Sequence, residues 1–526
     1  DAIAGAPLPP TMLQGDISLL YKKKDRLDPR NYRPLTMLNT DYKIYTKVLA
    51  NRLKKVVHQF VSEAQKGFVP DAFIAECSML MNLIEAWINE EVDDRKGLFL
   101  FLDMEKAFDR VSWEFLLEGL RSLGFGEEFI ALVQMMYDTN SPPQRRIIVN
   151  GEKGHYFPIK SGVAQGCPLS PLLFLVCAEV ILRLAKKHLK GIRVNRKKYK
   201  ASAFADDTVL LLGGIKDLKK VWGLLKRYNG ATGMLANAKK TEGLALGKMK
   251  KAIIPDTPII KKAQWAKEGD TIVCLGVPFG RNIDETAFWD SKYKKMKSRI
   301  AEWRSVKTRT QKGRVLLSKL FVWSRFRYWA QSMLMPKSTI LNTQRDIDSL
   351  IWAKDPEFVA EEKGTQIKFK RWMTREAATI RWGQGGLGIL DWPAHIKALQ
   401  AQWIIRYLDA SDAPYKHLLD VHIKNEWEHG RGVLLTTINT DDILDALPKK
   451  GVAWPYWRAA IAAFREVDFR PIPVRHNDKL TWKTMSAEPT FYNLRGELPV
   501  IDRVHHPELW LDNPVPRRLK TQINIV

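Results

Sequence analysis

Three carboxylates stand where apolar runs of the chain end or turn. Asp206 and Asp207 are adjacent and lie between two apolar segments, and Asp103 directly follows another. Neighbouring carboxylates repel each other unless a cation lies beside them, and Mg²⁺ prefers a few carboxylate oxygens together with water and substrate phosphates. Asp103 and Asp206 could hold two Mg²⁺ ions, which would stabilise both oxygens of an in-line phosphoryl displacement. The alternative for the adjacent pair is an ordinary tight turn, where Asp is common.

A segment rich in Gly and Pro at 161–171 has residues suited to contact a ligand. Gly162 and Gly166 allow the backbone to come close to another group, and the amide of Gln165 can both donate and accept a hydrogen bond. A single loop of this kind before a helix is weak evidence, so its weight comes from its combination with the carboxylates.

The carboxylates need a β-sheet to position them. Residues 98–102 form a short apolar run, which predicts a buried strand that delivers Asp103 to the edge of a sheet. Residues 200–212 predict two apolar strands of a hairpin, with Asp206 and Asp207 at its turn.

Helices are expected around this sheet. Apolar residues at helical spacing predict helices over 41–61, 113–123 and 170–190. Asp109 is expected to cap the helix that begins at Trp113. The first 250 residues are therefore predicted to mix strands and helices, whereas the stretch 290–350 is strongly helical in pattern.

Composition limits the class of protein. The chain has 526 residues, of which 45% are hydrophobic, enough for a large core in roughly three or four structural units. Its four cysteines include no C-x-x-C pair, which excludes a disulfide scaffold and gives no support for a zinc finger. No apolar run approaches the roughly 18 residues of a membrane span, so no membrane partner is expected. Because residue 1 is Asp, the chain is expected to be a piece of something longer.

Positive charge points to nucleic acid as the partner. The formal net charge is +26, and two runs concentrate it: residues 183–200 contain nine basic residues and no acid, and residues 292–327 contain thirteen with only Glu302 opposing them. A phosphate polymer compensates such runs through release of counterions. The alternative for either run alone is a solvated helix face.

In this order and spacing, the segments around Asp103, Gln165 and Asp206 resemble motifs A, B and C of reverse transcriptases. More closely, the chain resembles the reverse transcriptase of a non-LTR (LINE-type) retrotransposon, from about residue 5 to about residue 410. The further segments that carry the resemblance are 8–23, 28–35, 41–53, 65–70, 107–125, 232–242, 275–279 and 385–389.

The resemblance implies an α+β fold of the right-hand polymerase type, with a helical thumb and a mainly α-helical C-terminal region. Fingers and palm with an antiparallel sheet would occupy 1–245, and the thumb with its connecting segment 246–345. A basic, Trp-rich C-terminal region would occupy 346–526, and its function is left open.

The resemblance also implies roles for single residues. Asp103 and Asp206 would ligate two Mg²⁺ ions (or Mn²⁺), with Asp207 adjacent and supporting, and Lys240 would neutralise or protonate the pyrophosphate. Phe108 would crowd a ribose 2′-OH and so select deoxynucleotides. The nucleotide and primer end would be contacted by Lys22, Arg33, Phe108, Gln165, Gly166 and Ala205.

The second basic run would then grip the template–primer duplex. The implied contact residues are Lys292, Lys294, Lys295, Arg299, Arg304, Lys307, Arg309, Lys312 and Arg314. Trp303, Trp323, Phe326 and Trp329 interleave with these charges and are expected to be core rather than base-stacking residues.

The implied function is an RNA-directed DNA polymerase that extends a DNA 3′-OH on an RNA template. Its partners would be the RNA template, the DNA primer and target DNA, and dNTPs, in the nucleus and cytoplasm. The endonuclease of such elements is expected to lie upstream, outside this chain. Two alternatives remain: a catalytically silent RNA-binding protein or decayed element copy on the same fold, and an RNA-dependent RNA polymerase.

Departures from the family pattern give the first alternative some weight. Asp71-Ala72 replaces the usual Gly-Arg, and Ala164 replaces a common basic residue before Gln165. Both changes remove positive charge. The three aspartates and Gln165-Gly166 are intact, which favours an active enzyme.

Overall fold

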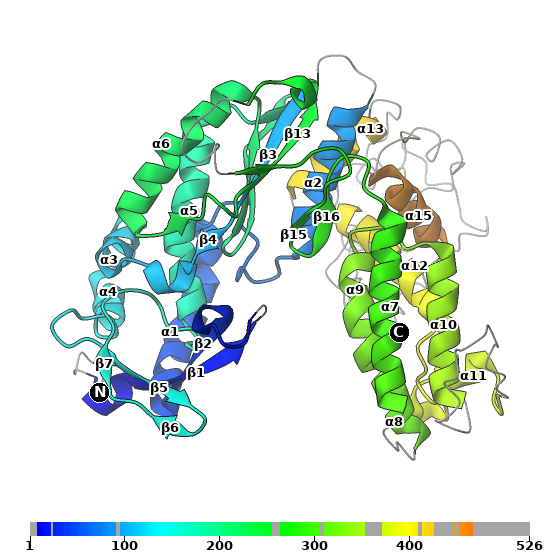
Figure 1. Cartoon of the computed structure of the whole chain (residues 1–526), viewed down its shortest axis with the longest axis horizontal. Helices are drawn as coiled ribbons and strands as arrows, with labels where there is room; N and C mark the ends of the chain where they lie inside the picture. Colours follow the sequence, from blue (N-terminus) through cyan, green and yellow to red (C-terminus); the bar gives the residue numbers. More distant parts are fainter. Residues whose placement is uncertain are drawn as a thin grey trace, which may run out of the picture. The chain divides into compact units, whose positions relative to one another are not determined.

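In the computed structural model (Figure 1), the chain forms two compact units. Unit 1 comprises Asp1–Cys77 and Val92–Lys267, and unit 2 comprises Ser78–Glu91 and Glu268–Val526. The residues that the structure describes are 8–22, 25–90, 95–254, 263–304, 310–352, 371–408, 413–424, 447 and 453–466.

Unit 1 contains a five-stranded sheet in the order β10-β11-β3-β13-β14. Its strands are β3 (Lys96–Leu102), β10 (Ala201–Phe204), β11 (Asp207–Leu212), β13 (Glu242–Gly247) and β14 (Gln264–Trp265). All neighbours are antiparallel except β13 and β14, which are parallel. The predicted strand at 98–102 and the predicted hairpin at 200–212 are both confirmed.

The register of this sheet explains why the three carboxylates meet. Thr208 of β11 pairs with Leu102 of β3 in antiparallel orientation. The next position along this register therefore places Asp207 beside Asp103, because residues opposite each other in an antiparallel pair lie roughly 5 Å apart. Asp206 precedes Asp207 in the turn between β10 and β11.

Unit 1 also contains helices, which pack on this sheet or on one another (Figure 1). They are α1 (Thr40–Phe60), α3 (Trp113–Ser122), α4 (Glu127–Gln134), α5 (Ser170–His188) and α6 (Ile215–Thr232), with single turns η2 (Pro10–Leu13), η3 (Pro29–Asn31), η4 (Ala107–Arg110) and η5 (Lys248–Lys251). The three helices predicted over 41–61, 113–123 and 170–190 are confirmed as α1, α3 and α5.

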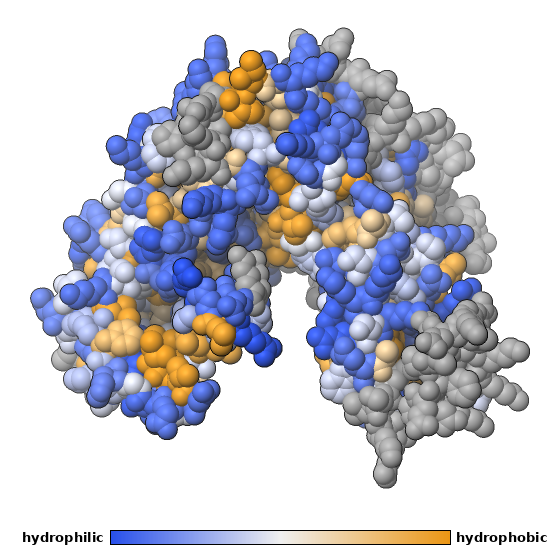
Figure 2. All heavy atoms as spheres, viewed as in Figure 1, coloured by the Kyte–Doolittle hydropathy of each residue, from blue (hydrophilic) through white to orange (hydrophobic). Residues whose placement is uncertain are grey.

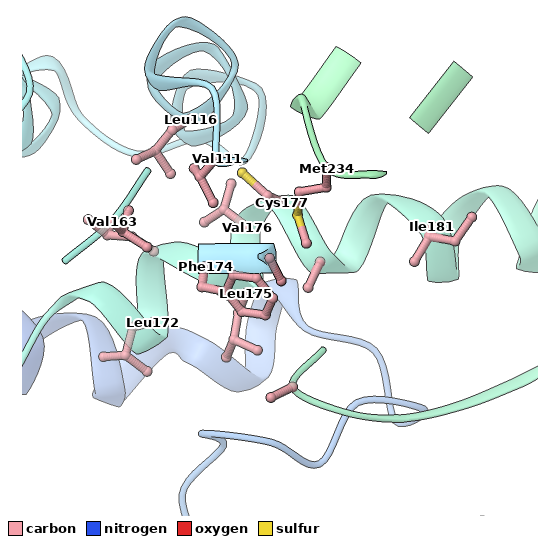
Figure 3. Packing of buried hydrophobic residues seen from close by; sticks show 14 of the residues in the cluster. Val111, Leu116, Val163, Leu172, Phe174, Leu175, Val176, Cys177, Ile181 and Met234 are labelled. Atoms are coloured by element: carbon pink, nitrogen blue, oxygen red, sulfur yellow. The ribbon is translucent and has the colours of Figure 1, made fainter. Parts of the chain in front are cut away.

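The hydrophobic core of unit 1 surrounds α5. Figure 3 shows buried residues along this helix, among them Leu172, Phe174 and Ile181, with Val111 and Leu116 in the same cluster. Each of these side chains is at most 1% exposed, so each stabilises the fold by about 1.5–3 kcal/mol. Because α5 also contacts α6 and β10, the core holds the hairpin that carries the carboxylates.

The cap of α3 corrects one expectation. Ser112, not Asp109, is the N-cap: its side chain accepts a hydrogen bond from the backbone N–H of Phe115 at 3.2 Å. Asp109 lies three residues too early, inside the single turn η4, where its N–H donates to the carbonyl of Lys106.

A second sheet of unit 1 has the order β2-β1-β5-β6, with β7 paired to β5. Its strands are β1 (Gln14–Tyr21), β2 (Tyr32–Leu38), β5 (Gln144–Val149), β6 (Glu152–Lys153) and β7 (Phe157–Pro158). Figure 2 shows hydrophobic residues gathered where Figure 1 draws β5 to β7, and Ile147 and Val149 are 41% and 51% exposed. Two short pairs, β4 (Met104–Glu105) with β12 (Leu235–Ala236) and β8 (Ile192–Val194) with β9 (Lys197–Tyr199), complete the unit.

Unit 2 is mainly helical in its described part. Its elements are α2 (Ala75–Asn89, of which Ser78 onward belongs to this unit), β15 (Ile272–Cys274), β16 (Val277–Phe279), α7 (Glu285–Arg304), α8 (Gln311–Ser318), the π-helix η6 (Lys319–Trp323), α9 (Ser324–Ala330), α10 (Lys337–Trp352), α11 (Arg375–Thr379), η7 (Trp382–Gln384), α12 (Trp392–Leu408), α13 (Pro414–Lys424) and α15 (Ala453–Arg465). The two units together confirm the α+β class.

Tryptophan forms much of the core of unit 2. The largest fully buried side chains there include Trp289, Trp392, Trp403, Trp454 and Trp457. Burial of these five rings accounts for part of the Trp content of unit 2.

The interleaved aromatic residues of unit 2 differ in exposure. Phe326 is buried, as expected, and Trp323 and Trp329 are half-buried. Trp303 is 37% exposed, so the expectation of a core position is wrong for this residue. None of the described helices combines the length and the apolar character needed to cross a membrane.

Candidate active site

The carboxylates of Asp103, Asp206 and Asp207 gather at one edge of the β10-β11-β3 sheet. All three remain accessible to solvent, and the Asp103 side chain is 45% exposed. Partial burial, followed by the negative charges of Asp206 and Asp103, raises the pKa of Asp207 to about 6. Partial burial and the charge of Asp103 also raise the pKa of Asp206. The site therefore has negative charge that its own residues do not fully neutralise.

Two cations from the β1–β2 hairpin face this negative charge. Lys22 directly follows β1, and Arg33 lies in β2 opposite Leu20. The positive charges of Lys22 and Arg33 lower the pKa of Asp206, and that of Lys22 also lowers the pKa of Asp207, so both effects oppose the upward shifts. The structure thus brings both predicted phosphate-binding residues near the carboxylates.

A small two-stranded sheet positions Lys240 at the site. β12 pairs with β4, and the N–H of Asn237 donates to the carbonyl of Asp103 at 2.7 Å. The turn that follows places Lys240 Nζ 3.5 Å from Asp103 Oδ2, with the lysine side chain 64% exposed. An exposed pair of this kind contributes at most about 1 kcal/mol, so Lys240 can leave Asp103 at little cost.

The turn between β10 and β11 contains a strained residue. Ala205 has φ +57, in the left-handed region, which costs a residue with a Cβ atom roughly 1–2 kcal/mol. Gln65 offsets this strain: its Oε1 accepts from the N–H of Ala205 at 2.8 Å and its Nε2 donates to the carbonyl of Ala205 at 3.1 Å. The sequence reasoning missed Gln65, although a glutamine two residues before a glycine and between apolar segments was a detectable signal.

Phe108 is held by stacking. Its ring lies parallel to that of the fully buried Phe174, with centroids 4.6 Å apart, and the ring of Phe68 meets it edge-on at 6.1 Å. Phe108 itself is half-buried, so part of the ring faces solvent. A ring fixed in this way can exclude a bulky neighbour because it cannot move aside without losing its stacking partner.

The loop with Gln165 and Gly166 is joined to two other parts of the site. The carbonyl of Gln165 accepts from the N–H of Thr36 in β2 at 2.8 Å, and the N–H of Val163 donates to the carbonyl of Phe108 at 2.8 Å. Gly166 has φ +124, and a Cβ there would lie 2.4 Å from the Thr36 carbonyl oxygen. The loop therefore connects the strand of Arg33 with the turn of Phe108.

The residues present suit Mg²⁺ that is completed by a substrate. Within the described part of the chain, no three His, Cys, Asp or Glu side chains lie close enough to form a complete metal cage. Mg²⁺ is commonly bound by one or two carboxylates together with substrate phosphates and water. The unneutralised charge of Asp103, Asp206 and Asp207 fits that mode of binding.

The predicted duplex-binding residues belong to unit 2. Lys294, Lys295 and Arg299 are exposed on α7. Lys292 packs against the rings of Phe288 and Trp329, Lys312 lies 5.5 Å above Trp382, and Arg314 Nη1 donates to the Ile351 carbonyl at 3.4 Å. Lys307, Arg309 and the side chain of Arg304 lie outside the described residues.

Residues 21–279 match the family profile described as reverse transcriptase (RNA-dependent DNA polymerase). The chain is 27% identical over 427 residues to the "Transposon TX1 uncharacterized 149 kDa protein" of Xenopus laevis, covering 79% of this chain and 30% of the relative. It is 32% identical over 194 residues to the "Retrovirus-related Pol polyprotein from type-1 retrotransposable element R2" of Nasonia vitripennis, covering 37% and 18%. The chain thus spans less than a third of the length of either relative.

Among solved structures, the chain is similar to apo telomerase from Candida tropicalis, with a TM-score of 0.38 and 11% identity over 65% of this chain and 57% of that one.

Proposed function

Because the chain contains a reverse transcriptase domain similar to those of non-LTR retrotransposons, we propose that it is an RNA-directed DNA polymerase. It extends a DNA 3′-OH along an RNA template by nucleotidyl transfer. The observation that carries this proposal is the meeting of Asp103, Asp206 and Asp207 at one sheet edge, with Lys22, Arg33 and Lys240 beside them.

The carboxylates provide the metal-binding side of the reaction. Asp103 and Asp206 would hold two Mg²⁺ ions, or Mn²⁺ in their place, with Asp207 supporting, and the metals would supply charge stabilisation to the attacking and leaving oxygens. Lys22 and Arg33 bind the triphosphate, Arg33 as a planar fork and Lys22 as a point charge. Lys240 leaves Asp103 to neutralise or protonate the departing pyrophosphate.

The loop and the aromatic ring choose the nucleotide. Gln165 and Gly166 lie along the incoming dNTP, and Phe108 excludes a ribose 2′-OH because Phe174 keeps its ring in place. Ala205 touches the primer end. Lys292 and the exposed cations of α7 hold the template–primer duplex through its phosphates, in a helix of near A-form.

The RNA template, DNA primer, target DNA and dNTPs are the proposed partners, and the nucleus and cytoplasm are the proposed locations. Fingers and palm over 1–245, a thumb over 246–345 and a C-terminal region over 346–526 remain the proposed functional division.

Primer extension tests the proposal. The reaction contains a heteropolymer RNA template, a DNA primer, Mg²⁺ and dNTPs, and it compares the wild type with Asp206→Ala/Asp207→Ala. We expect extension by the wild type and a loss of about 10³-fold or more in the double variant. The matched control is Glu127→Ala/Glu128→Ala, which removes an adjacent acidic pair from the first turn of α4 and should extend normally.

The same assay separates the alternatives. Extension with NTPs alone would identify an RNA polymerase and overturn the role given to Phe108. When dNTPs and NTPs compete, Phe108→Val should raise the use of NTPs relative to dNTPs at least ~10-fold. Phe115→Val, which changes a half-buried ring of α3, should leave this ratio unchanged. No extension with salt-sensitive RNA binding retained would instead identify a catalytically silent RNA-binding protein or a decayed element copy on the same fold.

A further inference from the structure

We infer that Gln65 is a positioning residue for the proposed reaction: its amide clamps the Ala205 turn and so sets the position of Asp206 and Asp207. This inference rests on the proposed function. Gln65 lies outside β10 and β11, and its side chain hydrogen-bonds both backbone groups of Ala205, the N–H and the carbonyl.

The clamp uses the whole amide group. Oε1 of Gln65 accepts two hydrogen bonds at 2.8 Å, from the N–H groups of Ala205 and Gly67, and Nε2 donates to the carbonyl of Ala205 at 3.1 Å. Gln65 is only 2% exposed, so water cannot replace these partners without opening the turn. A buried amide with three backbone hydrogen bonds fixes its target more tightly than an exposed one because every alternative partner is excluded.

The backbone around Gln65 is fastened to the same hairpin. Gln65 forms a parallel bridge with Ala203, in which the N–H of Ala203 donates to the carbonyl of Ala64 at 2.7 Å and the N–H of Lys66 donates to the carbonyl of Ala203 at 2.9 Å. The segment 64–67 therefore acts as a short extra strand along β10. Its position determines where the amide of Gln65 can reach.

Gly67 allows the approach. A Cβ atom at this position would lie 2.1 Å from the backbone N of Ala205, which no rearrangement of a flexible side chain could relieve. The absence of a side chain at Gly67 and the amide at Gln65 are thus two parts of one arrangement, in which one backbone lies directly against the turn.

The turn needs an external hold because its own conformation is unfavourable. Ala205 adopts φ +57 and directly precedes two carboxylates that repel each other and Asp103. Left-handed backbone at a non-glycine residue persists only where the surroundings impose it. Without the clamp, Ala205 would relax toward an extended or right-handed conformation and the carboxylates would move with it.

The position of these carboxylates matters to the reaction because metal-dependent transfer requires ligands fixed to within a fraction of an ångström. Loss of the clamp should therefore lower the rate of the catalytic step and weaken Mg²⁺ binding, while the affinity for the template–primer duplex stays the same. A purely structural glutamine would reduce stability without a selective effect on Mg²⁺.

Gln65→Met tests the inference, since methionine keeps the length and volume while it removes all three hydrogen bonds. We expect faster amide hydrogen exchange at Ala205 and Gly67, followed on peptides, with the exchange of α1 unchanged. We also expect kcat for primer extension to fall about 10- to 100-fold at nearly constant template–primer Kd, and the Mg²⁺ concentration for half-maximal activity to rise several-fold.

The matched control is Gln344→Met in unit 2. Gln344 is also buried, donates from Nε2 to Asp348 at 3.1 Å and accepts from the N–H of Trp392 at 2.7 Å. It should lower the thermal midpoint without changing the Mg²⁺ requirement. Equal effects of the two variants on the Mg²⁺ requirement would overturn the inference.

If Gln65→Met does not fold, Gln65→Asn replaces it, since asparagine keeps an uncharged amide but is one methylene group too short to reach both the N–H and the carbonyl of Ala205. Its exchange at Ala205 and its Mg²⁺ requirement should lie between those expected for the methionine variant and those of the wild type. Values identical to the wild type in both would contradict the clamp.

A readout without catalysis separates this inference from the proposed function. Mg²⁺ should raise the thermal midpoint of the wild type more than that of Gln65→Met. If the wild type does not extend primers but this difference and the exchange difference are found, the proposed function fails and the clamp stands. If neither difference is found, the clamp is refuted whatever the activity.

Discussion

At the residue scale, the titration of the Asp207 carboxylate should be measurable. Its pKa is raised to about 6 by partial burial and then by Asp206 and Asp103, against an ordinary value of 3.8. The folded protein therefore binds this proton more tightly than the unfolded chain does. The stabilisation that results is fully present below pH 3.8 and is lost as the pH rises through 6.

We predict that Asp207→Asn is more stable than the wild type above pH 6 in the absence of divalent metal. The thermal midpoint of both proteins, measured in EDTA from pH 4 to pH 8, should differ above pH 6 and converge toward pH 4. Asp25→Asn, an exposed aspartate for comparison, should show no such convergence. A difference that stays constant from pH 4 to pH 8 would contradict the pKa of about 6.

The types of the site residues could be predicted from the sequence, but several of their partners could not. Asp103, Asp206 and Asp207 follow from apolar runs that end in carboxylates. The contact of Lys240 with Asp103 depends on the pairing of β12 with β4, two strands of two residues each that leave no periodic pattern. Short pairings of this kind are determined by tertiary packing and not by local sequence.

At the element scale, the loop at Gly166 and strand β2 approach each other too closely for any side chain. Gly166→Ala places a Cβ 2.4 Å from the Thr36 carbonyl and also forces alanine to φ +124. Gly151 has φ +90 with open space around it, so Gly151→Ala adds only backbone strain.

We predict that Gly166→Ala destabilises unit 1 by at least ~2 kcal/mol, and Gly151→Ala by about 1 kcal/mol. The larger cost arises because the loop must move away from β2, which should also raise KM for dNTPs. Urea unfolding and primer extension measure the two effects. Equal losses of stability would mean that the loop yields without disturbing β2.

Most elements of unit 1 were predictable because their signals are local. The α5 segment is apolar at nearly every position, and the β10–β11 hairpin has apolar strands on both sides of Asp206 and Asp207. The cap of α3 was wrongly assigned to Asp109, although Ser112 stands directly before the helix. The membership of α2 in unit 2 could not be predicted, because it depends on contacts with residues more than 200 positions away.

At the scale of the whole molecule, the formal net charge of +26 should control how the chain binds nucleic acid. For about 6–10 phosphate contacts, affinity falls ~10³- to 10⁵-fold between 50 and 200 mM salt. We predict that Lys294→Ala/Lys295→Ala reduces the magnitude of the slope of log K against log salt by roughly 2, because each lysine accounts for about one phosphate.

Lys54→Ala/Lys55→Ala provides the comparison, since these lysines are also adjacent and exposed but lie on α1 of unit 1, outside both basic runs. Its slope should change less for a template–primer duplex. Fluorescence anisotropy over a salt series gives both slopes. A larger change for the α1 pair would contradict the assignment of the duplex-binding surface to α7.

The membership of α2 in unit 2 also affects how the protein is made. Leu83 and Ile84 of this helix are fully buried, and Asn82 donates to the carbonyl of Ser332 at 3.1 Å. At ~5–20 residues per second, a ribosome that has passed residue 91 needs about 12–50 s to reach Ser332. During that interval Asn82 lacks the carbonyl of Ser332, and until residue 268 is made the nascent helix lacks every later residue of unit 2, so its apolar side chains are a target for chaperones that bind chains during synthesis.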